Sequence, residues 1–314
     1  MNRKIMKNQY KNTFKAHLIP WLGAVMFSLL SCKVEGDDLA LTALPKADFE
    51  ATEIAPGKIK LVNTTPGPSI AHWTIVNSGQ KFAGNEVEVG LIFAGSYDVK
   101  LDVVAQGGMT SLTKAVNVSQ NDPDACNDTR ALGFIAGCSQ KKWKLNPEAG
   151  AFKVGPGIDD GSWWASDANA VKERSCEFND EFVFHFNAEG TFVYDNKGDY
   201  YADGYLGNSS TTCEGENNLT GNQALWKSGT FRFSVSEGTG ARKLGQLQLI
   251  GKGAHLGVKK AHNGGETPSG PVGDSVVYDI LEMTKNAEGK GYDLLKVGVN
   301  IGGDSWWTFT FRSY

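Results

Sequence analysis

The chain has 314 residues, with 31 Lys and Arg against 35 Asp and Glu, and these charges are unevenly distributed. The first 31 residues hold five bases and no acid, so the remainder carries 26 bases against 35 acids, a net charge of −9. This acidic body argues against a nucleic-acid partner, because such binding depends on Lys and Arg that neutralise phosphates. Hydrophobic residues make up 40% and charged residues 21%, which argues against a disordered chain. The 38 glycines predict many tight turns between short strands.

Residues 1–31 have the features of a signal peptide: a basic start up to Lys15, then an apolar stretch too short to span a membrane. The stretch ends in Leu29-Leu30-Ser31-Cys32, which resembles the lipobox of bacterial lipoproteins. The resemblance implies cleavage before Cys32 and a diacylglycerol on its thiol, so that the lipid alone anchors the protein to a membrane. The alternative is an ordinary signal peptide followed by a chance cysteine.

Residues 32–44 are polar and without periodicity, which predicts a tether. Its acidic cluster, Glu35-Gly36-Asp37-Asp38, resembles the surface-export signal of lipoproteins in the Bacteroidetes. That resemblance implies an outer-membrane protein exposed at the cell surface, whereas the alternative is simply a solvated linker.

The other four cysteines are Cys126, Cys138, Cys176 and Cys213. An even number in an exported chain favours two disulfides, with three pairings open. Loop length alone favours the nearest-neighbour pairing, Cys126 with Cys138 and Cys176 with Cys213. Zinc is the competing interpretation, but no Cys-x₂-Cys pair or nearby His supports it.

Residues 45–119 predict a domain of short strands, among them the alternating segment Ser96–Val103. The segment from Gly95 to Val103 matches Gly-x-Tyr-x-Val-x-Leu-x-Val, and together with Ala47-Asp48-Phe49 and Trp73 it resembles a PKD domain. The resemblance implies an Ig-like β-sandwich that acts as a spacer, with Trp73 in its core. The aspartates that usually follow the tryptophan are replaced here, so no calcium role is carried over.

Residues 120–314 predict a second all-β domain, a jelly-roll sandwich like those of carbohydrate-binding modules. Phe182, Phe184 and Phe186 share one face of a predicted strand, with Glu181, Val183 and His185 on the other, and Trp307, Phe309 and Phe311 share an apolar face. Only residues 166–174 look helical. No nucleophile elbow, zinc-protease helix or phosphate loop is present in the sequence.

The nearest acidic cluster lies around Glu177 and Glu181. On a strand, these carboxylates would stand roughly 13 Å apart, beyond the ~5–9.5 Å that glycosidases use. We therefore expect no enzyme, no catalytic residue and no metal or cofactor, although the Asp-rich loops leave a structural Ca²⁺ open.

Tryptophan is the distinctive residue of the second domain. Trp163 and Trp164 follow a Gly/Asp-rich stretch, where indoles have no regular core face to occupy and where binding residues are common. The alternative is that one of the pair anchors the loop into the core. Trp306 points away from the core face of its strand, either to a ligand or under a covering loop. Sugar rings present C–H faces that stack on such indoles. Asp160, Tyr201 and Arg174 are the polar and aromatic candidates beside them, with Arg174 alternatively in a salt bridge.

The second domain also resembles a family of domains in Bacteroidetes polysaccharide-utilisation proteins. The matching stretches are Trp143-Lys144-Leu145, Gly155-Pro156, Trp163-Trp164, Arg174-Ser175-Cys176, Asp180-Glu181-Phe182, Gly253–Gly257, Asn263-Gly264, Tyr278-Asp279-Ile280 and Trp306–Phe309. The resemblance implies a non-catalytic surface glycan-binding lipoprotein, a β-glucan such as laminarin as ligand, and an outer-membrane glycan transporter complex as a candidate partner. A glycoside hydrolase or lyase with an unrecognised site and a structural adhesin are the alternatives.

Overall fold

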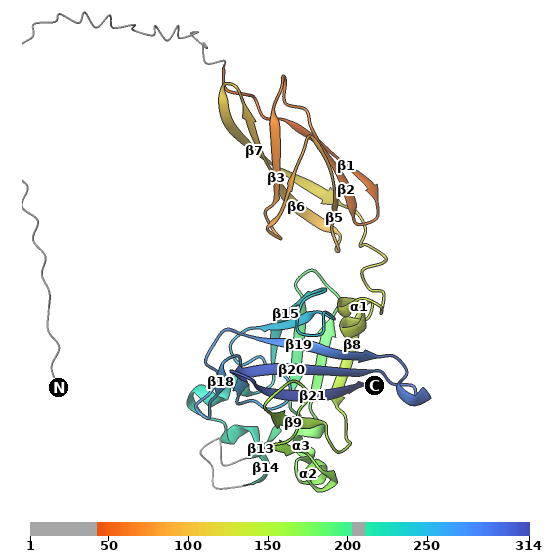
Figure 1. Ribbon diagram of the computed structural model, residues 1–314, viewed down its shortest axis with the longest axis vertical. Helices are drawn as coiled ribbons and strands as arrows, with labels where there is room; N and C mark the ends of the chain where they lie inside the picture. Colours follow the sequence, from red (N-terminus) through yellow and green to blue (C-terminus); the bar gives the residue numbers. More distant parts are fainter. Residues whose placement is uncertain (1–42, 203–210) are drawn as a thin grey trace, which may run out of the picture. The chain divides into compact units, whose positions relative to one another are not determined.

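The computed structural model describes residues 43–202 and 211–314 (Figure 1). The described residues bury two large hydrophobic cores, one made by residues 49–118 and the other by residues 131–311. A third, smaller cluster contains Tyr200, Ala202, Leu219 and Trp226. The predicted leader, the lipidation site Cys32 and nearly all of the tether lie outside the described residues. No helix in the described part of the chain is long and apolar enough to cross a membrane.

Two antiparallel sheets enclose the first core. The three-stranded sheet has the order β1-β2-β5 and the four-stranded sheet the order β4-β3-β6-β7. The strands are β1 (Phe49–Ala55), β2 (Lys58–Asn63), β3 (Ile70–Ile75), β4 (Gln80–Ala83), β5 (Glu86–Gly90), β6 (Gly95–Ala105) and β7 (Gly108–Val118). Trp73 is buried, as predicted, with its ring edge-on to Phe49 at 5.3 Å and its indole N–H donated to the carbonyl of Gly84 at 2.8 Å. The predicted β-sandwich is confirmed for this part.

The second core lies inside one antiparallel sheet in which eight strands follow one another in chain order. They are β8 (Gln140–Leu145), β11 (Glu181–His185), β12 (Thr191–Asp195), β15 (Gly229–Ser236), β16 (Gln246–Ile250), β19 (Ser275–Thr284), β20 (Leu294–Gly302) and β21 (Ser305–Ser313). The last strand also pairs with the first, Phe311 opposite Leu145, so the sheet closes on itself. Phe182, Phe309 and Phe311 fill its interior, as their alternation predicts.

The all-β class is confirmed, but the strand order differs from that of a jelly roll. A jelly roll contains Greek-key crossovers, whereas here each barrel strand pairs with its neighbours in chain order, as in an up-and-down barrel. Two further strands, β9 (Phe152–Gly155) and β10 (Trp164–Ala165), continue the sheet beside the first half of β21.

The connections alternate between the two ends of this barrel, and the long ones share one end. In an antiparallel meander every second connection lies at the same end. The connections after β9, β12 and β16 are long insertions, whereas those at the opposite end, after β11, β15 and β19, are short. The insertions contain α2 (Ala168–Glu173), α3 (Ser175–Phe178), β13 (Asp199–Ala202), β14 (Thr212–Gly215), η2 (Glu216–Asn218), η3 (Gly221–Trp226), β17 (Ala261–His262) and β18 (Gly265–Glu266). The remaining elements are α1 (Ala131–Ala136), before β8, and η4 (Ala287–Gly289), between β19 and β20. Long loops at one barrel mouth are where ligand sites commonly lie.

Local chemistry explains two features of the insertion-bearing end. The predicted short helix is α2, and Asp167 caps it by accepting hydrogen bonds from the backbone N–H groups of Asn169 and Ala170. The disulfides form as predicted, Cys126 with Cys138 and Cys176 with Cys213, and the second joins α3 to β14.

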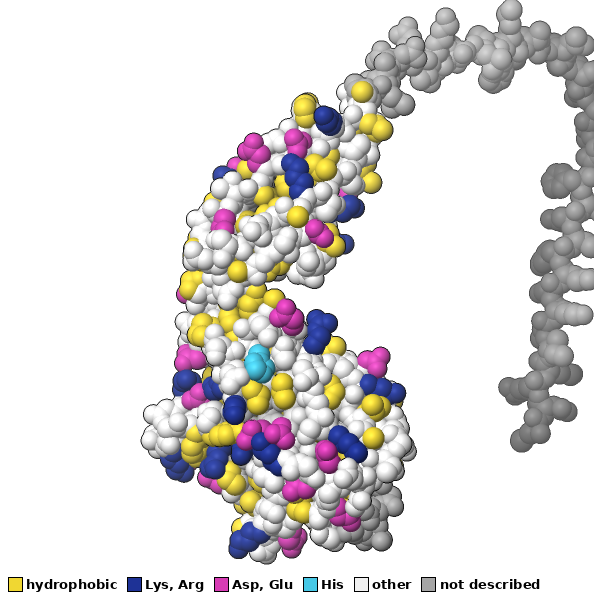
Figure 2. All heavy atoms as spheres, turned by 180° about the vertical axis from the view of Figure 1, so that it is seen from behind, with side chains coloured by type: hydrophobic (Ala, Val, Ile, Leu, Met, Phe, Trp, Pro, Cys, Tyr) yellow, Lys and Arg dark blue, Asp and Glu magenta, His cyan; other side chains and the backbone are white. Residues whose placement is uncertain are grey.

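On the face shown in Figure 2, acidic and basic side chains are interspersed rather than gathered by sign.

Candidate functional site

The predicted tryptophan pair lies at the insertion-bearing end of the barrel, on the outermost strand of the sheet. Trp164 begins β10 and pairs with Val154 of β9, and the backbone N–H of Trp163 donates to the carbonyl of Val154 at 3.2 Å. Trp163 is 57% exposed and Trp164 38% exposed. Both predicted binding aromatics are therefore open to solvent.

A second tryptophan supports Trp164 from the inner face of the sheet. Val154 pairs with Trp164 on one side and Trp307 on the other, and the two indole rings meet edge to face with centroids 6.1 Å apart. The ring of Trp307 is buried and stacks on Phe309. Trp164 thus rests on a fixed aromatic base, which keeps its ring in place without burying it.

Charged side chains in and next to the β17–β18 hairpin contact Trp307. The indole N–H of Trp307 donates to Glu266 Oε1 at 2.5 Å, and Lys260 Nζ lies 3.2 Å from the same oxygen. Lys260 Nζ also stands 5.5 Å from the centroid of the Trp307 ring. Sequence reasoning missed Glu266 and Lys260 because nothing in their local sequence places the hairpin beside the tryptophans.

The loop between β9 and β10 is held by Asp159, and Asp160, the predicted ligand contact, follows it in the same loop. Asp159 accepts hydrogen bonds from Lys153 at 3.0 Å and Lys296 at 2.9 Å. Burial tends to raise the pKa of Asp159, but these two lysines lower it below its usual value. The Asp160 carboxylate is half-buried and accepts the backbone N–H of Ser162 at 2.6 Å. Asp160 therefore shapes the turn that leads into Trp163.

Trp306 lies on the outer face of β21 and is half-buried. A Cβ atom on Gly298 of the adjacent strand would come within 3.3 Å of the Trp306 ring, so the ring lies over this glycine. Farther along β21, Thr308 is fully covered, and its hydroxyl accepts the backbone N–H of Asp159. The structure thus places Trp306 at the margin of the covering loop, apart from the Trp164–Trp307 contact.

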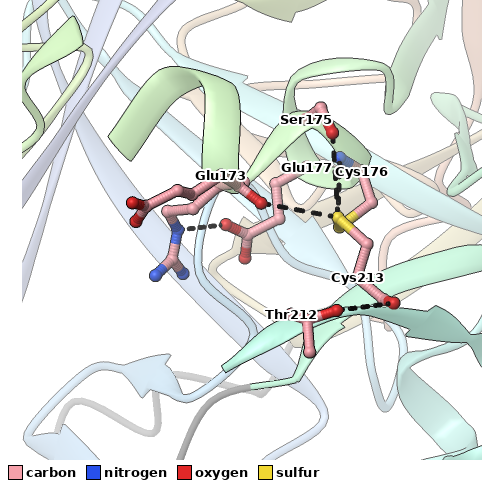
Figure 3. Close-up of a disulfide and its surroundings, with 7 residues drawn as sticks. Glu173, Ser175, Cys176, Glu177, Thr212 and Cys213 are labelled. Atoms are coloured by element: carbon pink, nitrogen blue, oxygen red, sulfur yellow. Dashed lines mark hydrogen bonds and ion pairs between the residues drawn. A yellow bond between two sulfur atoms is a disulfide. The ribbon is translucent and has the colours of Figure 1, made fainter. Parts of the chain in front are cut away.

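Arg174 and Tyr201 were expected at the binding surface, but the structure buries both. Arg174 is 8% exposed and Tyr201 7% exposed. The Arg174 side chain donates to Glu177 at 2.6 Å and packs over the Tyr201 ring at 4.1 Å. Figure 3 shows Glu177 beside the Cys176–Cys213 disulfide. Their assignment as ligand contacts is corrected here, because a guanidinium in a buried ion pair holds the fold together and leaves no face for a sugar.

The carboxylates of Glu177 and Glu181 form ion pairs with basic side chains of the fold. Glu177 belongs to helix α3 rather than to a strand, and its buried carboxylate is paired with Arg174. Glu181 begins β11, where Lys197 Nζ lies 3.0 Å from its carboxylate. Burial favours a raised pKa at Glu181, but hydrogen bonds with Tyr314 and Lys197 lower that pKa to about 2. Among the described residues, no group of three or more His, Cys, Asp or Glu side chains could hold a metal ion.

A second set of polar groups is buried beneath the loop that follows β16. Asp180 Oδ2 accepts the hydroxyl of Tyr194 at 2.8 Å, and the Tyr194 ring contacts His255 with centroids 4.6 Å apart. Burial raises the pKa of Asp180 to about 8, against the opposing effects of the Lys259 charge and the Tyr194 hydroxyl. Burial lowers the pKa of His255 to about 3, and the Lys259 charge acts in the same direction. Asp180 and His255 are therefore both neutral at pH 7, and neither is exposed to solvent.

Replacing Asp180 with asparagine is expected to change how stability depends on pH. Between pH 4 and 8 the unfolded carboxyl is ionised while the folded one keeps its proton, so the contribution of Asp180 to the free energy of unfolding falls by up to roughly 1.4 kcal/mol per pH unit as pH rises. Asp180→Asn keeps an acceptor for Tyr194 and removes this slope. Chemical unfolding at pH 5 and pH 8 should show the variant gaining stability relative to the wild type as pH rises. A difference that stays constant with pH would contradict the buried, protonated state of Asp180.

Comparison with solved structures finds similarity to PKD domains. The chain is similar to the crystal structures of the PKD1 domain of Vibrio anguillarum Epp and of the PKD1 domain from the Vibrio cholerae metalloprotease PrtV. Each is 23% identical and matches 24% of this chain, with TM-scores of 0.23 and 0.22, while 95% and 99% of the respective PKD domains are covered. No protein-family description matches the chain. No curated protein matches it either. The similarity to PKD domains is weak and concerns the fold alone.

Proposed function

We propose that this protein is a non-catalytic lipoprotein of the outer-membrane surface that binds a polysaccharide for uptake. The observation that carries the proposal is the exposed Trp163–Trp164 pair, in which Trp164 rests on the buried Trp307. The indole N–H of Trp307 is in turn bonded to the charged side chain of Glu266. Exposed indoles next to a few oriented polar groups suit sugar rings, which present apolar faces and hydroxyl edges. Such a site has no need of a buried active-site cleft.

The remaining parts of the proposal follow from the sequence. A lipid on Cys32 would anchor the chain, the PKD-like domain would act as a spacer, and the barrel would hold the glycan. A β-glucan of the laminarin type is the first ligand to test, and a glycan transporter complex of the outer membrane is the proposed partner. Glu177 and Glu181 support a binding role over hydrolysis, because each carboxylate is held in its own ion pair, Glu177 with Arg174 and Glu181 with Lys197.

Affinity electrophoresis of residues 33–314 tests the proposal. Native gels containing laminarin, lichenan, xylan or alginate are compared with a gel that contains no polysaccharide. We expect retardation in at least one neutral polysaccharide without release of reducing ends. Release of reducing ends would indicate a hydrolase instead of a non-catalytic binding protein, and unsaturated products would indicate a lyase. Unchanged mobility in every gel would favour a structural adhesin.

A further inference from the structure

We propose that Glu266 is the specificity-determining residue of the glycan site and that it selects a neutral sugar through its hydroxyl groups. This inference rests on the proposed polysaccharide-binding function and adds a ligand class to it. Glu266 ends the β17–β18 hairpin, and its side chain is 34% exposed. It contacts Trp307, whose ring in turn contacts the exposed Trp164.

The two oxygens of the Glu266 carboxylate have different surroundings. Oε1 accepts the indole N–H of Trp307 at 2.5 Å and lies 3.2 Å from Lys260 Nζ. Among the described residues, Oε2 takes part in no hydrogen bond, and the side chain as a whole is 34% exposed. These two contacts hold Oε1 in place and restrict the movement of the carboxylate beside Trp307. An acceptor held in this way loses little conformational entropy when a ligand binds.

The hairpin that carries Glu266 is itself held in place at its turn. The Asn263 side chain accepts the backbone N–H of Val277 at 2.7 Å and donates to the carbonyl of the same residue at 2.9 Å. The backbone N–H of Gly264 donates to the carbonyl of Asn300 at 3.0 Å. The hairpin is therefore bonded to both β19 and β20, and it positions Glu266 from a rigid part of the barrel.

The chemistry of this arrangement points to one class of ligand. An ionised carboxylate can only accept hydrogen bonds, and those it accepts are charge-assisted and strong. Sugar hydroxyls are suitable donors, whereas the carboxylate of a uronic acid or a sulfate ester would bring a like charge towards Oε2. Glu266 and Trp164 both contact Trp307, so the proposed site combines an aromatic face with this acceptor. The site is thus suited to a neutral polysaccharide and disfavours a polyanionic one.

The substitution Glu266→Gln tests this inference, with Glu189→Gln as the matched control. Glutamine keeps the size and an oxygen acceptor for the Trp307 indole but removes the charge, so the melting temperature should stay within a few degrees. Glu189 lies in the short β11–β12 connection at the opposite end of the barrel and is exposed. For residues 33–314 in affinity gels with laminarin, we expect Glu266→Gln to weaken binding at least about tenfold, or ~1.4 kcal/mol. The control should bind as the wild type does, and alginate should retard the wild type less than laminarin.

The possible outcomes distinguish the role of Glu266 from the proposed polysaccharide-binding function on which it rests. If laminarin retards the wild type and Trp164→Ala abolishes that retardation while Glu266→Gln binds within twofold of the wild type, the role of Glu266 is overturned and the glycan-binding function stands. Equal or stronger retardation by alginate overturns the preference for neutral sugars. If no polysaccharide retards the wild type, the proposed function fails and this inference fails with it.

Discussion

Alanine at Trp163 or at Trp164 is expected to abolish retardation by polysaccharide while leaving the barrel folded. Large aromatic side chains at the centre of a binding surface commonly contribute about 2 kcal/mol or more, which corresponds to roughly 30-fold in affinity. Trp163 is mostly solvent-exposed, so its removal should shift the melting temperature by no more than a few degrees. Trp164→Ala should cost somewhat more stability, because it also loses the ring contact with Trp307. Affinity electrophoresis and thermal melts of the same preparations measure both effects.

A matched aromatic at the other end of the barrel provides the control for this experiment. Tyr292 is partly exposed in the short β19–β20 connection, so Tyr292→Ala removes an aromatic ring without touching the insertion-bearing end. Its retardation should equal that of the wild type. If both tryptophan variants instead lose their cooperative melt, the pair belongs to the folding core. If both melt normally and bind as before, the glycan site lies elsewhere.

The sequence was most informative where a pattern is local. Strand alternation identifies the buried faces of Phe182, Phe309 and Phe311 because neighbouring side chains point to opposite sides of a sheet. Loop length favours the two disulfides that form. Closure of the barrel has no such local signal, since it depends on pairing Phe311 with Leu145, 166 positions earlier in the chain. The jelly-roll topology was therefore the wrong choice between two all-β arrangements.

For the candidate site too, only the residues with a local sequence signal could be predicted. Trp163 and Trp164 could be recognised because a Gly/Asp-rich loop offers indoles no core, and both are exposed. Arg174 and Tyr201 were misplaced because their burial arises from packing between α3 and β13, which belong to separate insertions. Glu266 was overlooked because its short hairpin reaches the tryptophans only once the barrel has closed. Residues of the site that depend on long-range closure cannot be read from spacing alone.

Alanine at Gly253 is expected to be among the most damaging single substitutions in the barrel. Gly253 has a φ of +102°, and a Cβ there would stand 1.9 Å from the carbonyl oxygen of Leu225. An L-residue therefore meets both backbone strain and a clash with main-chain atoms. The loop that begins here buries His255 and Leu256 against the core. We expect a loss of at least ~3 kcal/mol in the free energy of unfolding.

Gly238→Ala separates the clash from the strain, because Gly238 has a φ of +66° and open space where its Cβ would lie. It should cost only about 1–2 kcal/mol, the usual penalty for a left-handed residue. Urea unfolding of both variants measures the difference, and similar losses would show that the loop at Gly253 moves aside without penalty. Because this loop leads directly into Lys260, beside Glu266, any surviving folded Gly253→Ala protein should also bind polysaccharide more weakly. Gly238→Ala, in the connection at the opposite end of the barrel, should not. Gly253→Ala is thus expected to lower both the free energy of unfolding and the affinity of the proposed glycan site, because the same loop supports both.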